Sequence, residues 1–241
     1  MQLETGPSIG QNDEVRSSVF PVASLDPGDT SKVKQFCGTG FFIGSRGFGM
    51  SAAHVATLGA PSLCALMVRN STWFGFEIRD IEHHPLHDIA VFSVAPATDN
   101  SWRGAPRGSV DDTRASFGYS LWGYPQDTYI ETIQDHGAPR PDLIYSAGHV
   151  RRRLSNITHP GIRGDTFLEL SQVAGLGCSG GPLFGINLAQ ANLLLAGIYV
   201  GERLDQKATS VGYGVPFSAF GNWSPGLLGR TIRAEIASGA V

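Results

Sequence analysis

Short apolar segments separated by glycine and proline constrain the fold of this chain more than any other feature of its sequence. The 241 residues include 31 glycines and 14 prolines, and long stretches with helical periodicity are scarce. Glycine and proline mark turns, so the segments between them are typical of short strands. The sequence therefore predicts an all-β protein, and its length suits one protein with two β-barrels or two small domains.

Two groups of predicted strands are separated by a connecting segment. Residues 95–115 are rich in proline, glycine, serine and charge, and they show no clear periodicity. Strands are expected at 19–23, 38–43, 47–51, 63–68, 74–81 and 88–94, and then at 116–123, 142–154, 165–171, 182–184, 193–200 and 212–217. The domains are therefore predicted as 15–115 and 116–241. A short terminal helix is predicted from four apolar residues at roughly helical spacing, namely Leu227, Leu228, Ile232 and Ile236.

A serine lies inside the glycine-rich run Gly177-Cys178-Ser179-Gly180-Gly181-Pro182. Glycines beside a nucleophile permit a tight turn with positive φ values and let a substrate carbonyl approach the backbone. In such a turn the amides of Gly177 and Ser179 are candidates for an oxyanion hole. The run predicts that Ser179 is the nucleophile of a hydrolase.

A nucleophilic serine needs a base and an orienting carboxylate, and both candidates lie upstream. His54 follows an apolar stretch, and Asp88 opens another strand-like run. The order His54, Asp88, Ser179 is the one that chymotrypsin-type proteases use, and it differs from the subtilisin and α/β-hydrolase orders. The three residues are therefore candidates for a catalytic triad.

Three segments carry a resemblance to a known family: Ser51-Ala52-Ala53-His54, His84-Pro85-Leu86-His87-Asp88-Ile89-Ala90-Val91 and the run around Ser179. On these segments the chain resembles the chymotrypsin/trypsin-like serine peptidases, and it is closer to the bacterial, non-zymogen members. The resemblance covers most of the chain, from about Val19 to about Phe220. It implies two six-stranded antiparallel β-barrels of the chymotrypsin type, to which the short C-terminal helix is added.

The resemblance also implies a mechanism that needs no metal or cofactor. Ser179 attacks a peptide carbonyl to form an acyl-enzyme, and His54 takes the serine proton and returns it to the leaving amine. Asp88 holds the imidazole of His54 in the required tautomer. The expected function is a serine endopeptidase whose partner is a protein or peptide substrate.

The substrate pocket is predicted from the resemblance as well. It implies a pocket floor at Val173, where neighbouring Ala174 and Gly212 would leave an apolar and fairly open slot, so a medium apolar P1 side chain is expected. Glu202 leaves open the alternative of a basic P1 residue. The strand that would pair with the substrate backbone supplies three further candidates, Tyr199, Val200 and Gly201.

Two of these motifs have alternative interpretations. The cluster His83, His84, His87 and Asp88 contains residue types that bind zinc. Alternation along a strand would separate His87 from Asp88, which argues against a metal site. Cys178 is a rival nucleophile, but placing it in the catalytic position would put Ser179 where the first following glycine belongs.

The cysteines and the N-terminal sequence suggest an intracellular protein without zymogen activation. Cys37 matches a half-cystine of the family, but the residue after the catalytic histidine, where its partner belongs, is Val55. Three cysteines cannot all pair, as is typical of reduced proteins. Cys178 replaces the aspartate to which the new N-terminus of a cleaved zymogen pairs, so we expect either constitutive activity or switching by a regulatory protein partner.

Charge and hydropathy bear on the partners. A net charge of −3 makes nucleic-acid binding an unlikely function, although Arg151-Arg152-Arg153 forms either a solvated strand edge or a site for an acidic partner. No run of about 18 apolar residues and no signal peptide are present, so a cytoplasmic protein that does not bind membranes is expected. Two alternatives to the peptidase remain open: a catalytically silent binding or sensor domain with a protease fold, and an esterase-type acyl hydrolase.

Overall fold

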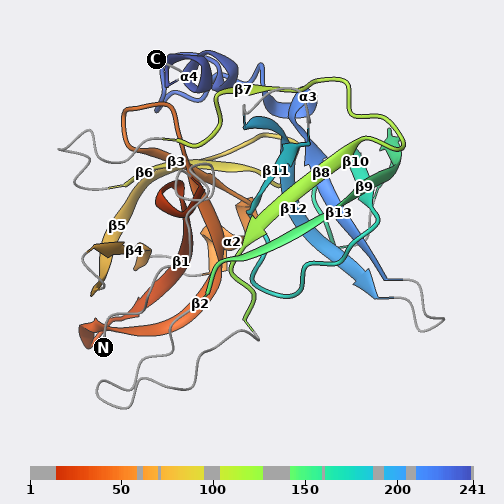
Figure 1. Ribbon diagram of the computed structural model, residues 1–241. Coiled ribbons are helices and arrows are strands. Elements are labelled where there is room, and N and C mark those ends of the chain that lie inside the picture. The colour runs from red at the N-terminus through yellow and green to blue at the C-terminus, as the bar shows by residue number, and fades with distance from the viewer. Residues whose placement is uncertain are drawn as a thin grey trace, which may run out of the picture.

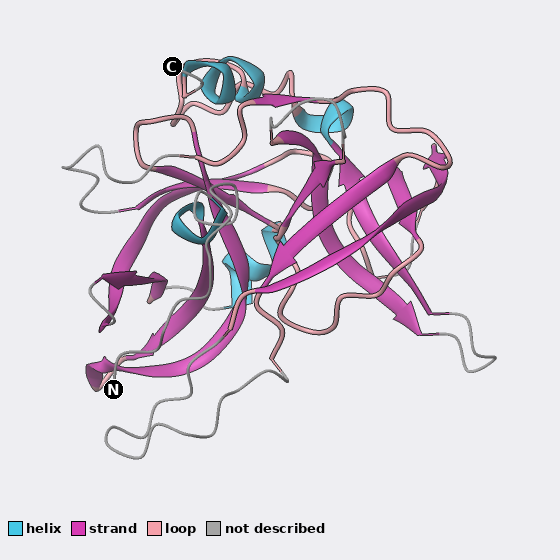
Figure 2. Ribbon diagram, viewed as in Figure 1, coloured by secondary structure: helices cyan, strands magenta, loops and turns pink. Residues whose placement is uncertain are grey.

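The strands form two β-barrels that lie side by side (Figure 1). The computed structural model describes residues 15–58, 62–69, 72–94, 104–126, 142–158, 161–186, 193–204 and 210–239. Few residues are helical (Figure 2). The all-β prediction with two six-stranded antiparallel barrels is confirmed.

The first barrel is closed and has the strand order β1-β2-β3-β6-β5-β4. Its strands are β1 (Val19–Asp26), β2 (Asp29–Ile43), β3 (Phe48–Ser51), β4 (Leu63–Arg69), β5 (Thr72–His83) and β6 (Ala90–Val94). Each overlaps a strand expected from the sequence, but β2 begins nine residues before the expected strand 38–43. The expected strand 88–94 begins two residues too early, because Asp88 and Ile89 belong to the corner that precedes β6.

The second barrel has the order β11-β8-β9-β10-β13-β12 and is closed by the pairing of β11 with β12. Its strands are β8 (Gly118–Gly123), β9 (Ile144–Ser155), β10 (Thr166–Leu170), β11 (Pro182–Gly185), β12 (Leu194–Leu204) and β13 (Ser210–Pro216). A two-residue strand, β7 (Gly108–Ser109), lies in the predicted connection and pairs in parallel with β12. Such a short strand leaves no periodicity to read. The domain division at 115/116 stays a prediction.

Glycines in the first barrel make room for aromatic rings. A Cβ atom on Gly40 would lie 2.6 Å from the ring of Phe20, and one on Gly49 would lie 2.5 Å from the ring of Phe92. The two rings pack edge to face with centroids 6.4 Å apart. Packing therefore requires glycine at these two strand positions. The high glycine content thus reflects close packing inside the barrel as well as turns.

The C-terminal helix α4 (Ile232–Ser238) packs back on the first barrel (Figure 1). Its N-cap is Thr231, whose hydroxyl accepts a hydrogen bond of 3.1 Å from Ala234 N. The helix is shorter than the segment predicted to be helical. Leu227 and Leu228 lie instead in a turn that ends at Gly229, where φ is +67°. Two other short helices, α2 (Ala53–Leu58) and α3 (Phe217–Phe220), were not predicted.

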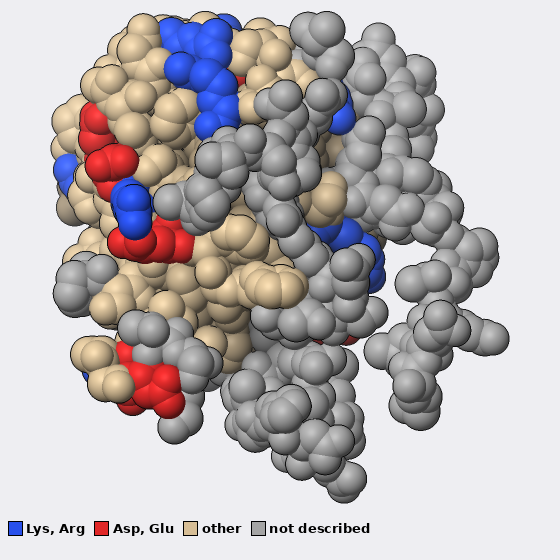
Figure 3. Space-filling view, turned by 90° about the vertical axis from the view of Figure 1, so that its left-hand side faces the viewer, with Lys and Arg blue, Asp and Glu red and all other residues tan. Residues whose placement is uncertain are grey.

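The exposed charged side chains form small groups. On the face drawn in Figure 3, some of the described basic and acidic residues lie next to each other, and no large patch of one sign is visible among them. On β9, Arg151 and Arg152 pair with Glu169, and Arg153 donates to the Ser218 hydroxyl. These contacts favour the solvated strand edge over a site for an acidic partner.

Candidate active site

His54 is oriented by two hydrogen bonds to one carboxylate. It is the second residue of α2, which begins two residues after β3 ends. Its ring Nδ1 lies 2.6 Å from Asp88 Oδ2, and its backbone N donates to Asp88 Oδ1 over 2.9 Å. The side chain of Asp88 is 6% exposed and that of His54 is 40% exposed. A carboxylate at Nδ1 keeps the ring proton there and leaves Nε2 as the basic nitrogen.

Asp88 belongs to a tight corner, residues 84–89, between β5 and β6. Within the corner, His84 Nδ1 accepts hydrogen bonds from Leu86 N at 3.1 Å and from His87 N at 3.0 Å. The second barrel holds the same corner, since Asp88 N donates to Arg163 O over 3.0 Å. His87 and Asp88 are therefore not alternating residues of a strand, so the argument from alternation does not apply to them.

The corner buries two histidines that stay neutral. Burial, with the neighbouring charges of His87 and Arg163, lowers the pKa of His84 from 6.5 to about 4. Burial also lowers the pKa of His87, although Asp165 acts in the opposite direction. The ring of His84 contacts that of Trp223 edge to face, with centroids 5.1 Å apart. The rings of His84 and His87, with centroids 5.0 Å apart, therefore pack together with Trp223 inside the corner that carries Asp88.

Ser179 lies in the predicted glycine turn. Gly177 and Gly180 have φ values of +96° and +90°, which glycine adopts without strain. A Cβ on Gly180 would lie 2.1 Å from the carbonyl oxygen of Thr39, so no other residue fits there. Among the described residues, the amides of Gly177 and Ser179, the two predicted oxyanion donors, donate no backbone hydrogen bond.

Thr39, on β2 of the first barrel, fixes this turn and was missed by the sequence analysis. Its N donates to Ser179 O over 2.8 Å, and its hydroxyl donates to Gly177 O over 2.8 Å. The same hydroxyl accepts from Tyr124 N at 2.9 Å. The available signal was Gly38-Thr39-Gly40, because two glycines within one strand indicate the close approach of another backbone.

A single cavity of about 780 Å³ joins these groups. His54, Asp88 and Ser179 all line it, so residues from both barrels share one space. Among the described residues there is no hydrogen bond between the Ser179 hydroxyl and the His54 ring. Such bonds are often long in free enzymes and shorten when substrate binds.

The predicted substrate contacts divide into two groups. Three of them line the cavity, Tyr199, Val200 and Gly201, and Glu202 lines it as well. Three others, Val173, Ala174 and Gly212, are absent from its wall, which differs from the open slot expected there. The physical reason is that the Tyr199 side chain fills this slot, since a Cβ on Gly212 would lie 2.9 Å from the tyrosine ring.

The rival nucleophile Cys178 is fully buried. Its Sγ lies 3.1 Å from Ala174 O in the core of the second barrel. Cys37 and Cys64 are free and buried as well, and burial raises the pKa of the Cys64 thiol to about 12. None of the three thiols lines the cavity.

The described part of the chain has neither a candidate metal cluster nor a helix that could span a membrane. It contains no group of three or more His, Cys, Asp or Glu side chains arranged to hold a metal ion. Nor does any of its helices have the length and apolar character needed to cross a bilayer.

Comparisons with solved structures agree with this architecture. The protease domain of MamO from Magnetospirillum magneticum matches with a TM-score of 0.61 and 16% identity, over 86% of this chain and 96% of that one. The active form of the Rv3671c protease from M. tuberculosis matches with a TM-score of 0.56 and 18% identity, over 90% and 88%. This chain has the fold of the trypsin-like serine proteases.

A further structure of this fold is the HtrA-type protease AlgW with a decapeptide. It matches with a TM-score of 0.60 and 15% identity, over 88% of this chain and 65% of that one. No protein-family profile and no curated protein sequence matches the chain. At such identities, the similarity to serine proteases establishes the fold, and the chemistry has to be argued from this chain's own residues.

Proposed function

We propose that this protein is a serine endopeptidase that acts through His54, Asp88 and Ser179. The observation that carries the proposal is the doubly hydrogen-bonded pair of His54 and Asp88 on the wall of a cavity shared with Ser179. In this cavity Nε2 of the imidazole is the base that takes the serine proton as the hydroxyl attacks a peptide carbonyl. The buried carboxylate stabilises the imidazolium that forms.

The turn around Ser179 supplies the second element of the mechanism. The N–H groups of Gly177 and Ser179 are the donors for the oxyanion, and each contributes about 3 kcal/mol to the stability of the transition state. Thr39 positions this turn from the first barrel through Gly177 O and Ser179 O. Preorganised donors of this kind favour acyl transfer over simple binding.

The substrate in this proposal is a protein or peptide. An extended peptide adds to the outer side of β12 near Val200, the residue at which the pairing register with β13 shifts. Control by a regulatory protein partner and a cytoplasmic location remain predictions from the sequence.

Labelling with a fluorophosphonate, followed by digestion of a peptide library, tests the proposal. We expect the wild-type protein to be labelled and to cleave peptides, and Ser179→Ala to do neither. The absence of labelling in a folded wild-type protein would contradict the proposal and favour a silent binding domain. Labelling and hydrolysis of small esters without peptide cleavage would identify an esterase instead.

A further inference from the structure

The side chain of Tyr199 lies where the pocket for the P1 residue was expected to be open. Its backbone is fully used within the barrel, since N donates to Gly181 O over 2.9 Å and O accepts from Gly180 N at 2.7 Å. These bonds place Tyr199 next to the turn that carries Ser179. Its side chain points into the core of the second barrel, and the residue is only 1% exposed.

The tyrosine hydroxyl is held at the far end of this slot. It accepts a hydrogen bond from Ala174 N at 3.3 Å and donates to Glu202 Oε2 over 3.1 Å. The same carboxylate oxygen accepts from Gly175 N at 3.2 Å. Burial raises the pKa of the Tyr199 phenol, so the hydroxyl stays protonated as a donor to Glu202. The ring is therefore fixed between the 174–175 segment and β12.

Gly212 shows that the ring occupies the depth of the slot. A Cβ on Gly212 would lie 2.9 Å from Tyr199 Cε2 and 2.6 Å from Gln172 O. The space above Gly212, which the sequence analysis assigned to the substrate, therefore contains the protein's own aromatic ring. What remains for a substrate is the open cavity in front of the ring, between Gly175 and Gly201.

We propose that Tyr199 restricts the residue before the cleaved bond to glycine, alanine or serine. The inference rests on the proposed peptidase function, and it replaces the medium apolar preference expected from the sequence. A side chain as large as leucine would have to displace a ring that two hydrogen bonds hold in a packed core. Glu202, which left open a basic residue at this position, has Oε2 engaged by two hydrogen bonds that hold the ring and the 174–175 segment.

Cleavage-site profiling by mass spectrometry tests this restriction directly. In a library of unstructured peptides, the wild-type protein is expected to cleave after glycine, alanine or serine with kcat/KM at least about tenfold above that for leucine, phenylalanine or arginine. Comparable or faster cleavage after any of the three large residues would overturn the inference.

Two substitutions at the same position separate the ring from the hydroxyl. Tyr199→Val removes the ring, and cleavage after leucine is expected to rise at least about tenfold relative to cleavage after alanine. The matched control Tyr199→Phe keeps the ring and is expected to keep the preference for small residues. An unchanged profile in folded Tyr199→Val would contradict the inference.

Removal of a core ring leaves a cavity that destabilises the fold, so a test on the wild-type protein accompanies Tyr199→Val. Peptidyl phosphonates with alanine or leucine at P1 serve this purpose, and the alanine compound is expected to inactivate at least about tenfold faster. Equal or reversed rates would overturn the inference while leaving the peptidase proposal intact. A wild-type protein that reacts with neither compound, nor with a simple fluorophosphonate, would overturn both.

Discussion

Asp88 is the side chain whose geometry bears most directly on the proposed catalysis. It binds both the ring and the backbone of His54 and is almost fully buried. The sequence predicted its role from the order of three residues along the chain. It did not predict the hydrogen bond to the His54 backbone, which depends on α2 beginning at Ala53.

Asp88→Asn tests this role. The amide preserves the shape of the carboxyl group but favours the wrong tautomer of His54, so kcat is expected to fall about 10⁴-fold with the fold retained. The measurement is peptide hydrolysis, with circular dichroism as the control for folding. A loss of less than tenfold would contradict the assignment.

Thr39 provides a second test, because it acts on Ser179 only through the backbone. Thr39→Val removes the hydroxyl that binds Gly177 O and Tyr124 N. The turn loses one of its two links to β2, and kcat/KM is expected to fall on the order of 10²-fold. Thr39→Ser keeps the hydroxyl and is the matched control. Equal activities of the two variants would show that this link does not position the turn.

At the scale of structural elements, the corner between β5 and β6 makes the stability of the fold depend on pH. His84 is surrounded by His87, Arg163 and Trp223, and its pKa in the folded protein lies below the unfolded value. The unfolded chain therefore binds a proton more tightly at this residue than the folded protein does. The free energy of unfolding is therefore unaffected by protonation of His84 above about pH 6.5, and it decreases as the pH falls from about 6.5 toward about 4.

His84→Asn is the variant that isolates this effect. The asparagine Oδ1 can accept the hydrogen bonds from Leu86 N and His87 N, but it does not titrate in this range. Urea unfolding between pH 4 and pH 7 is expected to show a weaker decline of stability on acidification in the variant than in the wild type. An identical pH dependence would mean that His84 does not control it.

The terminal helix α4 depends on a buried carboxylate. Glu235 is fully buried, and it accepts hydrogen bonds from Arg46 of the β2–β3 turn and from Arg230, which lies 2.6 Å away. Both arginines keep part of their surface in water. The helical periodicity predicted that a helix exists here, but a partner 189 residues away could not be inferred from it.

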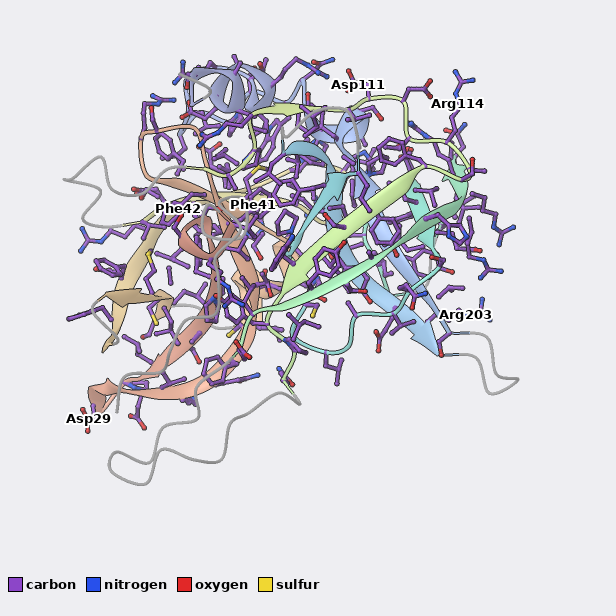
Figure 4. All side chains as sticks on the ribbon, viewed as in Figure 1. Asp29, Phe41, Phe42, Asp111, Arg114 and Arg203 are labelled. Carbon is purple, nitrogen blue, oxygen red and sulfur yellow. The ribbon has the colours of Figure 1, made fainter. Side chains whose placement is uncertain are left out.

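Glu235→Ala is expected to lower the free energy of unfolding by about 2 kcal/mol, since hydrogen bonds to charged groups contribute about 1.5–3 kcal/mol. The matched control is Asp112→Ala, because Asp112 is exposed and pairs with Arg114, which lies at the edge of the molecule (Figure 4). That change is expected to leave stability nearly unchanged. Chemical unfolding measures both, and equal effects would contradict the account.

The two barrels share a large buried cluster and one cavity, although the second barrel also has a smaller cluster of its own. Phe41 and Phe42 of the first barrel (Figure 4) belong to the same buried cluster as Phe184 and Val215 of the second. Cutting the chain between the barrels would expose this core and separate His54 and Asp88 from Ser179. Most strands could be predicted because glycine and proline bound the apolar segments, whereas the two barrels were implied by the resemblance of three motifs to a known family.

The parts that could not be predicted are those that depend on contacts between distant segments. The direction of the Tyr199 side chain is set by bonds to Gly180, Gly181 and Glu202, and in the sequence it is indistinguishable from any strand tyrosine. Thr39 binds a residue of the serine turn, Gly177, that lies 138 residues further along the chain. Local patterns can indicate that such residues are buried, but they cannot give the partner.

The central claim is that His54 activates Ser179 across the interface of the two barrels. The rate of phosphonylation by a fluorophosphonate, followed by intact mass and mapped to one residue, measures this activation. We predict a single adduct on Ser179 in the wild type and a rate lower by at least about 10³-fold in His54→Ala. Equal rates in the two proteins, or an adduct on any other residue, would contradict the claim.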